Sequence, residues 1–365
     1  MKHIYFTPGP SQLFPEVTGY MKQAIRDDIC SISHRSKAFQ EIAHTCQNNL
    51  RKLLMIPPSF PVFFLSSSLE SMERIIQNTV EARSFHLVNG AFAHAWHRAA
   101  TGLGKDATAH IFEAGTIPDT QNMQVPKGTE LICITQNETS NGTSIPLKKI
   151  YELKKRYPRI PIVLDVVSSA PYPKIDFKKI DGIFFSVQKG FGIPAGLGVL
   201  AVCDTLVQKS IELRKKQKRI ESYHDFESLL KKEAVFQTPE TPNVLDIYLL
   251  SKVTTLMLEK GISVIRKETK QKEKILSSFF SKSTLGELSI KNKEARSQTV
   301  IVVNIHENKA SHLIDALRKK GLVVGSGYKE CKETQIRIAN FPQHTVGDMY
   351  KLINALKIFE KKIGD

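Results

Sequence analysis

The sequence contains no long hydrophobic run, few cysteines and fewer acidic than basic residues. No segment reaches the roughly 18 consecutive apolar residues of a membrane-spanning helix, so we expect no membrane span. The first residues, MKHIYFTPGPSQ, contain one lysine and no long apolar stretch, so we expect no secretory signal. The five cysteines are odd in number and widely spaced, which fits neither a disulfide framework nor a zinc cluster. We therefore predict a protein of the reducing cytoplasm with no metal site.

The charge is strongly positive, with 52 Lys and Arg against 36 Asp and Glu and a formal net charge of +16. Basic residues dominate nucleic-acid binding through phosphate contacts. Here they are scattered along helix-like stretches, densest at 214–219, and no aromatic residues are interleaved with them. We therefore expect solvated helix faces, no nucleic-acid partner and an electrostatic field that favours anionic small substrates.

Short apolar runs alternate with helix-length segments between about residues 60 and 205. Six of these runs are typical of strands: PVFFLS, SFHLVNG, ELICITQ, IPIVLD, GIFFSV and GVLAVC. Helices are expected between several of them, for instance over 71–82 and 147–157. The alternation predicts an α/β fold with a mainly parallel sheet covered by helices on both faces. Ligands in such folds bind beyond the carboxyl ends of the strands.

The pattern changes after QTPETPN at 237–243. A long helix pattern begins at Val244 and continues beyond Gly261. Two strand-like runs, SQTVIVVNI and TQIRIAN, follow with helices around 310–320 and 345–361. We predict an N-terminal arm over 1–14, a large α/β domain over 15–245 and a smaller α+β domain over 246–365.

The segment DGIFFSVQKGFGIPAGLGVLAV at 181–202 is the most informative part of the chain for function. It places Lys189 directly after an apolar strand and before a glycine-rich loop. Asp165 ends another apolar strand, so the two side chains can face one pocket. This pair suits pyridoxal phosphate, since a lysine forms the Schiff base and a carboxylate keeps the pyridine nitrogen protonated. Either residue alone would favour an ordinary α/β turn.

Five motifs extend this interpretation over nearly the whole chain. They are FTPGPSQLFPEV at 6–17, SISHRSKAF at 31–39, NETSNG at 137–142, SVQKGFGIPAGLGV at 186–199 and RIANF at 337–341. With them the chain resembles the class V aminotransferases among the fold-type I pyridoxal-phosphate enzymes, and within these the phosphoserine aminotransferases. The resemblance implies a large domain with a seven-stranded sheet, a small C-terminal domain, and a homodimer with shared active sites.

The resemblance also assigns roles around the cofactor. It implies that Lys189 forms the Schiff base and then moves the proton between the substrate Cα and the cofactor. Asp165 would pair with the pyridine nitrogen, and the Thr139 hydroxyl would contact the phenolic oxygen. Phe92 matches the aromatic residue that stacks on the pyridine ring, although by itself it would be assigned to the core.

The cofactor phosphate needs donors at a helix N-terminus, where free backbone N–H groups and the helix dipole favour an anion. The segment LSSSLESMERII fits, and we place Ser68 and Leu69 against the phosphate with Gln188 as a further donor. By itself this segment could equally be a serine-capped helix without a ligand. The resemblance implies that Gln237 and Thr238 complete the phosphate site across a dimer interface, whereas the sequence alone favours a linker turn.

The substrates implied by the resemblance are amino acids and 2-oxo acids. Arg337 matches the arginine that holds the substrate α-carboxylate, a role that suits a planar, permanently charged guanidinium. His34 and Arg35 match the element associated with the distal anionic group of the substrate. The implied reaction is amino-group exchange between O-phosphoserine and 2-oxoglutarate in serine biosynthesis.

Two departures from the family pattern leave alternatives open. Glu70 or a neighbour lies where phosphoserine aminotransferases have an arginine, and VVGSGYKECKETQIR lacks their His-Arg pair. Lys329 or Lys332 is a candidate replacement, with the less specific grip of a point charge. The GSGY stretch resembles relatives that act on serine or alanine with glyoxylate or pyruvate. The chain could then be one of those enzymes.

Two further alternatives are a cysteine desulfurase and a non-catalytic anion-binding homologue. A desulfurase needs a loop cysteine, for which Cys331 is a candidate, but Gln188 lies where those enzymes usually have a histidine. A binding protein that had lost its chemistry would have no reason to retain Lys189, Asp165, Thr139 and Arg337 together.

Overall fold

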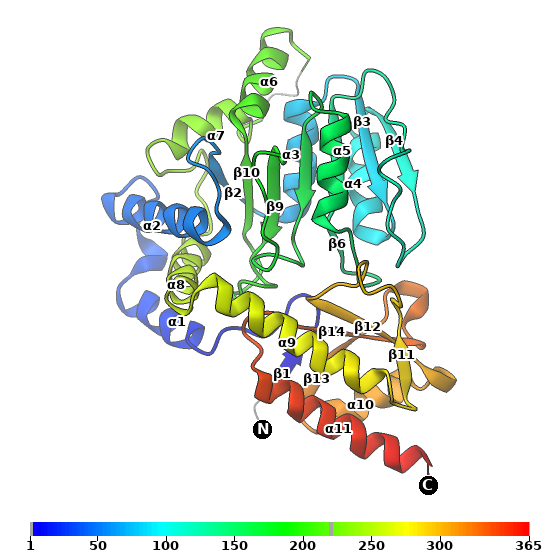
Figure 1. Ribbon diagram of the computed structural model, residues 1–365. Coiled ribbons are helices and arrows are strands. Elements are labelled where there is room, and N and C mark those ends of the chain that lie inside the picture. Colours follow the sequence, from blue (N-terminus) through cyan, green and yellow to red (C-terminus); the bar gives the residue numbers. More distant parts are fainter. Residues whose placement is uncertain (1–2, 219–221, 365) are drawn as a thin grey trace.

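The computed structural model describes residues 3–218 and 222–364. Figure 1 shows a larger part built around a central sheet and a smaller part that carries the C-terminal helix. The two termini lie in the smaller part, because the first strand, β1 (Ile4–Phe6), pairs with β13 (Leu322–Ser326) of the small sheet. The chain therefore starts in the smaller part before it enters the larger one.

The large sheet has seven strands in the order β2-β10-β9-β8-β5-β3-β4. Their bounds are Val62–Leu65 (β2), Arg83–Val88 (β3), Asp106–Ile111 (β4), Leu131–Thr135 (β5), Ile162–Asp165 (β8), Gly182–Ser186 (β9) and Gly198–Val202 (β10). All six predicted strand runs are strands, and the predicted mainly parallel sheet is confirmed. Strand β10 alone runs antiparallel to its neighbours, β2 and β9. The loop between β9 and β10 is too short for the crossover helix that a parallel neighbour requires.

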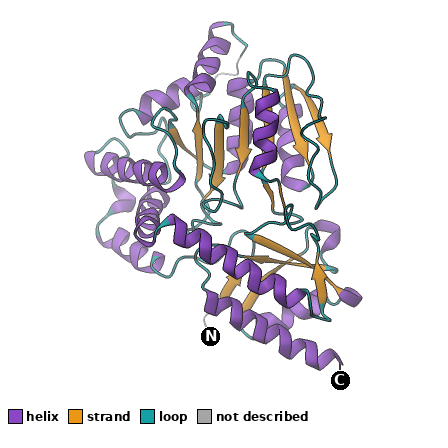
Figure 2. Cartoon of the chain, viewed as in Figure 1, coloured by secondary structure: helices purple, strands orange, loops and turns teal. Residues whose placement is uncertain are grey.

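Helices flank this sheet, as Figure 2 shows, and strands β2, β5, β8, β9 and β10 are buried along their whole length. This burial is the reason that these strands are almost uninterruptedly apolar. The helices of the larger part are α1 (Val17–Arg26), α2 (Lys37–Leu54), α3 (Ser68–Thr79), α4 (Ala91–Gly102), α5 (Leu147–Arg156), α6 (Asp204–Lys215), α7 (Phe226–Glu233) and α8 (Val244–Lys260). Helix α3 begins three residues before the predicted start because the Ser67 hydroxyl caps it, accepting from the backbone N–H of Glu70 at 3.1 Å.

The small sheet has five strands in the order β1-β13-β14-β12-β11. The remaining strands are β11 (Gly286–Leu288), β12 (Val300–Ile305) and β14 (Gln335–Ala339), with a separate pair, β6 (Asn137–Glu138) and β7 (Thr143–Ser144). The helices here are α9 (Ile262–Phe280), α10 (Ala310–Lys319) and α11 (Val346–Gly364), with 3-10 turns at His306–Asn308 and Lys329–Cys331. A further 3-10 turn, Ile29–Ser31, lies in the larger part against α1 and α8.

Two hydrophobic cores follow from this arrangement. Helix α8 packs on α2 and α1 and belongs to the core of the larger part. Helix α9 joins the two cores, since Ile265 packs into the first and Leu276 into the second. The domain limits given above remain a prediction. In the described ranges 3–218 and 222–364, no helix is both long and apolar enough to cross a membrane.

Candidate active site

A cavity of about 550 Å³ lies at the carboxyl edge of the large sheet, where the small sheet faces it. Asp165 ends β8 and Lys189 follows β9, while Gly325 and Arg337 of the small sheet line the cavity from the other part. Parallel strands bring their carboxyl ends to one edge, which explains why residues far apart in sequence meet here. Eight predicted site residues line this cavity: Ser68, Leu69, Phe92, Thr139, Asp165, Gln188, Lys189 and Arg337.

Lys189 is buried, with 7% of its surface exposed. Its Nζ donates to the Thr139 hydroxyl at 3.1 Å and lies 5.2 Å from the centroid of the Phe92 ring. Burial lowers the pKa of Lys189 to about 8, although the carboxylates of Asp165 and Glu138 oppose the shift. A lysine with this pKa reaches its neutral, proton-accepting form close to physiological pH.

Asp165 is the buried carboxyl group of the cavity. One oxygen accepts from the backbone N–H of Val167 at 2.9 Å, and the other accepts from the Thr135 hydroxyl at 3.4 Å. Burial raises the pKa of Asp165 to about 7, and the Val167 N–H and the Lys189 ammonium oppose this shift. A cation placed against this carboxyl group would stabilise its ionised form.

The N-terminal segment packs closely against Lys189. Gly9 has a φ of +147°, and a Cβ at this position would lie 2.7 Å from Lys189 Cε. The Gln343 amide donates to the carbonyl oxygens of Gln12 at 2.8 Å and Lys189 at 2.9 Å, which ties the segment to the lysine loop. The TPGP sequence was identified only as part of a family motif, so this packing role was missed.

Glu138 is a fully buried carboxylate that the sequence analysis also missed. It accepts from the backbone N–H groups of Phe92 and Ala93, both at 3.0 Å, in the first turn of α4. An anion is stabilised at this end of a helix. Gly90 permits the approach, because a Cβ there would lie 2.3 Å from Glu138 Cγ. This contact holds the start of α4, and with it Phe92, at the cavity. In the sequence, only the position of Glu138 within the NETSNG motif pointed to a role for it.

The N-terminus of α3 forms the opposite wall. The Ser68 N–H donates to the Ser186 hydroxyl at 3.0 Å, which joins the helix start to the end of β9. Gly198 allows β10 to come close, since a Cβ there would lie 2.5 Å from the Ser67 carbonyl oxygen. The Leu69 side chain is exposed. A helix start at a cavity wall favours an anion, through free N–H groups and the dipole.

Arg337 enters from the small sheet. Its Nε donates to the Ser326 carbonyl oxygen at 2.8 Å and its Nη1 to the Thr139 carbonyl oxygen at 3.3 Å. The guanidinium lies 5.5 Å from the centroid of the Tyr328 ring, a neighbour that was not predicted. Burial lowers the pKa of Arg337, yet a guanidinium keeps its charge at physiological pH. The two backbone contacts orient this cation.

The other four predicted site residues, His34, Arg35, Gln237 and Thr238, are not in the cavity lining of the described chain. Arg35 instead binds the turn that contains the last two. It donates to Gln237 Oε1 at 2.9 Å and to the carbonyl oxygens of Thr238 at 2.7 Å and Pro239 at 3.0 Å. Burial and the neighbouring Arg35 lower the pKa of His34. These four residues form a separate cluster, and their roles remain predictions.

The candidate replacement cations lie elsewhere as well. Lys329 and Lys332 are at the turn after β13 and outside the cavity lining of the described residues, as is Cys331. Arg318, at the end of α10, lines the cavity although no motif indicated it. Within residues 3–218 and 222–364, no group of three or more His, Cys, Asp or Glu side chains is arranged to hold a metal ion.

Comparison with known proteins agrees with this geometry. A family model described as Aminotransferase class-V matches residues 3–346. A phosphoserine aminotransferase structure from Cytophaga hutchinsonii is 44% identical, with a TM-score of 0.95 over 97% of this chain and 98% of the other. The phosphoserine aminotransferase of Lactococcus lactis subsp. cremoris (strain MG1363) is 26% identical over 98% of both chains. An alanine–glyoxylate aminotransferase structure from Nostoc sp., 20% identical with a TM-score of 0.84, shares the fold.

The protein therefore belongs to the class-V aminotransferase family and has the fold-type I architecture. The cofactor of this family is pyridoxal 5′-phosphate. The cavity fits that group in three respects. It contains a buried lysine with a lowered pKa, a buried carboxyl group with a raised pKa, and a helix N-terminus for the phosphate. The predicted enzyme class and cofactor are confirmed.

Proposed function

We propose that this protein is a homodimeric transaminase of the cytoplasm. It exchanges an amino group between O-phosphoserine and 2-oxoglutarate, giving 3-phosphohydroxypyruvate and glutamate. The observation that carries the proposal is the convergence of Lys189, Asp165 and Arg337 on one cavity. The 44% identity to the phosphoserine aminotransferase of C. hutchinsonii supports the choice of substrate.

The residues of the cavity divide the chemistry among them. When bound, pyridoxal 5′-phosphate supplies an electron sink and carries the amino group between the two half-reactions. Lys189, as a neutral amine, would take the proton from the substrate Cα and deliver it to the cofactor in one half-reaction, and would move it in the opposite direction in the other. Asp165 would keep the pyridine nitrogen protonated, Thr139 would hold the phenolic oxygen, and Phe92 would pack against the ring.

Substrate binding combines Arg337 with residues of a second copy of the chain. Arg337 grips the α-carboxylate that both amino donor and acceptor carry. Ser68, Leu69 and Gln188 line the cavity and would hold the cofactor phosphate of the same chain. The cluster of His34, Arg35, Gln237 and Thr238 would reach the cavity of the neighbouring subunit, because it does not line its own.

A second candidate function is transamination of serine or alanine with glyoxylate or pyruvate. It is favoured because neither His34 nor Arg35 is in the cavity lining of the described chain, where the cations besides Lys189 are Arg318 and Arg337. Neither Lys329 nor Lys332 adds a charge there. Such an enzyme would need Arg337, a small distal pocket and the cofactor phosphate site, but no second site for a phosphate group on the substrate.

The visible absorption spectrum of the cofactor-loaded protein separates the two candidates. O-phosphoserine, serine and alanine would be added in parallel over a range of concentrations. We expect loss of the visible band at a far lower concentration of O-phosphoserine than of the other two. A response to serine or alanine at the lower concentration would assign the protein to the glyoxylate- or pyruvate-linked activity, and no response to any amino acid would refute a transaminase.

A further inference from the structure

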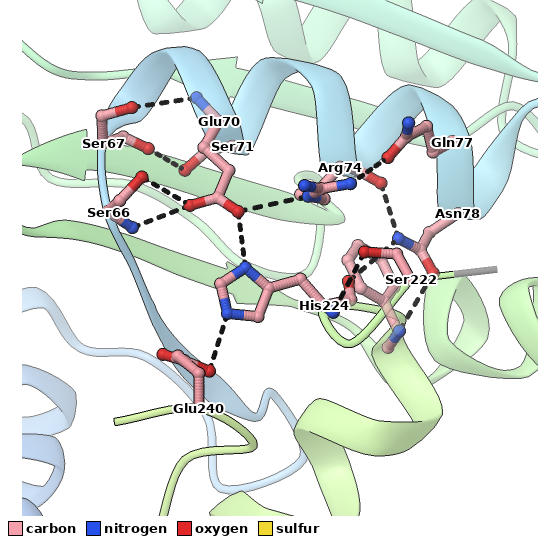
Figure 3. A network of polar contacts seen from close by, with 11 residues as sticks. Ser66, Ser67, Glu70, Ser71, Arg74, Gln77, Asn78, Ser222, His224 and Glu240 are labelled. Carbon is pink, nitrogen blue, oxygen red and sulfur yellow. Dashed lines mark hydrogen bonds and ion pairs between the residues drawn. The ribbon is translucent and has the colours of Figure 1, made fainter. Parts of the chain in front are cut away.

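A buried histidine outside the cavity lies between two carboxylates, as Figure 3 shows. His224, in the loop before α7, has a side chain that is only 3% exposed. Its Nδ1 lies 2.5 Å from Glu70 Oε1 and its Nε2 lies 2.8 Å from Glu240 Oε2. An ionised carboxylate only accepts hydrogen bonds, so both ring nitrogens must donate. Only the protonated, cationic imidazolium can do so.

Burial and hydrogen bonding shift the pKa values of His224 and Glu70 in opposite directions. Burial by itself would lower the pKa of His224, but the hydrogen bonds to Glu240 and Glu70 outweigh it and raise the pKa to about 9. Burial would raise the pKa of Glu70, but the hydrogen bonds from His224 and Ser66 lower it to about 2. Arg74 also pairs with Glu70, and the Tyr223 ring lies against the His224 ring. Asp225 follows His224 in the chain. The interaction is complete at neutral pH and is lost as pH rises through about 9.

Glu70 connects this ion pair to the wall of the cavity. Its Oε2 accepts from the Ser66 backbone N–H at 2.8 Å and from the Ser66 hydroxyl at 2.7 Å. Its Oε1 also accepts from Arg74 at 3.2 Å. Ser66 precedes the α3 cap Ser67 and the cavity residue Ser68, so the Glu70 carboxylate fixes the turn that begins the helix (Figure 3).

This carboxylate poses an electrostatic problem, because it lies in the first turn of the helix proposed to bind the cofactor phosphate. Two like charges near one helix start repel each other. Arg74 and His224 supply two positive charges, and Glu70 and Glu240 supply two negative ones, so the group as a whole is neutral. Without the imidazolium it would carry a net negative charge beside the phosphate site.

We propose that His224 is a positioning residue for the cofactor phosphate. It cancels the charge of Glu70 and so lets that carboxylate shape the 66–68 turn without repelling the anion. It also joins this turn to Glu240, whose carbonyl oxygen accepts from the Thr238 hydroxyl at 2.7 Å. The inference rests on the proposed phosphate site at α3.

The test compares pyridoxal 5′-phosphate with pyridoxal as ligands of the cofactor-free protein. Both aldehydes would react with Lys189, so titration of the lysine affects both equally, and the ratio of their affinities reports the phosphate site. The variants are His224→Gln, the double variant Glu70→Gln with His224→Gln, and His312→Gln as an exposed control on α10. Dissociation constants are measured by absorbance at neutral pH and, for the unsubstituted protein, across pH 7 to about 10.

We expect His224→Gln to reduce the preference for the phosphorylated ligand about tenfold, the effect of one uncompensated charge at short range. Glu70→Gln in the same protein should restore most of that preference, since it removes the excess negative charge. The unsubstituted protein should lose preference as pH rises through about 9, a change that is absent in His224→Gln.

Equal weakening of both ligands would overturn the inference, because His224 would then support only the fold. An unchanged ratio would overturn it as well. If His224→Gln does not fold, Glu240→Gln provides the test: it should lower the pH at which the preference is lost, and no movement would count against the role. An unsubstituted protein that binds neither ligand would refute the proposed function itself, together with this inference.

Discussion

The two halves of the candidate site differ in how they are built. Lys189 and Asp165 are fixed by neighbouring strands of one sheet, whose spacing is about 4.8 Å, and both are buried. Arg35 and Thr238 belong to loops that bind each other away from the cavity. In the proposed function, a single chain therefore supplies the groups for the reaction class, and a second copy would supply the groups that choose the substrate.

The largest effect should follow from Lys189→Ala, which removes the proposed proton-transfer group from the part of the site that lies within one chain. We expect turnover of O-phosphoserine with 2-oxoglutarate to fall at least about a thousandfold, since both nucleophile and base are lost. Steady-state assays would measure this, with circular dichroism to show that the fold persists. Normal turnover in a folded variant would remove the basis of the proposed function.

Asp165→Asn should have the next largest effect. The amide keeps the shape of the side chain but cannot carry the negative charge that holds the pyridine nitrogen protonated, so we expect kcat to fall about a hundredfold. Single-turnover kinetics would separate this loss from slower product release. Asp176→Asn, at an exposed carboxylate of the following loop that pairs with Lys179, is the matched control. Equal activity of the two variants would show that Asp165 has no electronic role.

The positions of Lys189 and Asp165 could be predicted because the sequence patterns that indicate strand ends are local. A continuous apolar run ending in Asp165, and another followed by Lys189, give strand ends, and the α/β pattern puts those ends at one edge. The apolar spacing predicted a helix over 71–82, whereas the serine-rich segment before it was considered as a helix cap, and the structure begins α3 at Ser68 with Ser67 as the cap. Local sequence patterns therefore predict whether a segment is a helix or a strand better than they predict the residue at which it begins.

The contributions of Gly9, Glu138 and His224 could not be predicted in the same way. Each depends on contact between segments far apart in the chain: Gly9 with Lys189, Glu138 with the start of α4, and His224 with α3. A buried glutamate or histidine is indistinguishable in sequence from a surface residue until the fold supplies its partners. Glu70 illustrates this, since it was noted only as the place of a missing arginine, yet its carboxylate has four polar contacts.

Arg35→Ala should have the smallest effect and addresses the other half of the comparison. If Arg35 binds the distal anionic group across the dimer, KM for O-phosphoserine should rise about tenfold while that for alanine stays unchanged. Arg26→Ala, at an exposed arginine at the end of α1, is the control. The contacts of Arg35 with the 237–239 turn allow the opposite result, in which both amino acids weaken equally because the turn has lost its anchor. An equal loss would mean that Arg35 supports the cofactor site of the second chain, and substrate selection would then rest with Arg318 and Arg337.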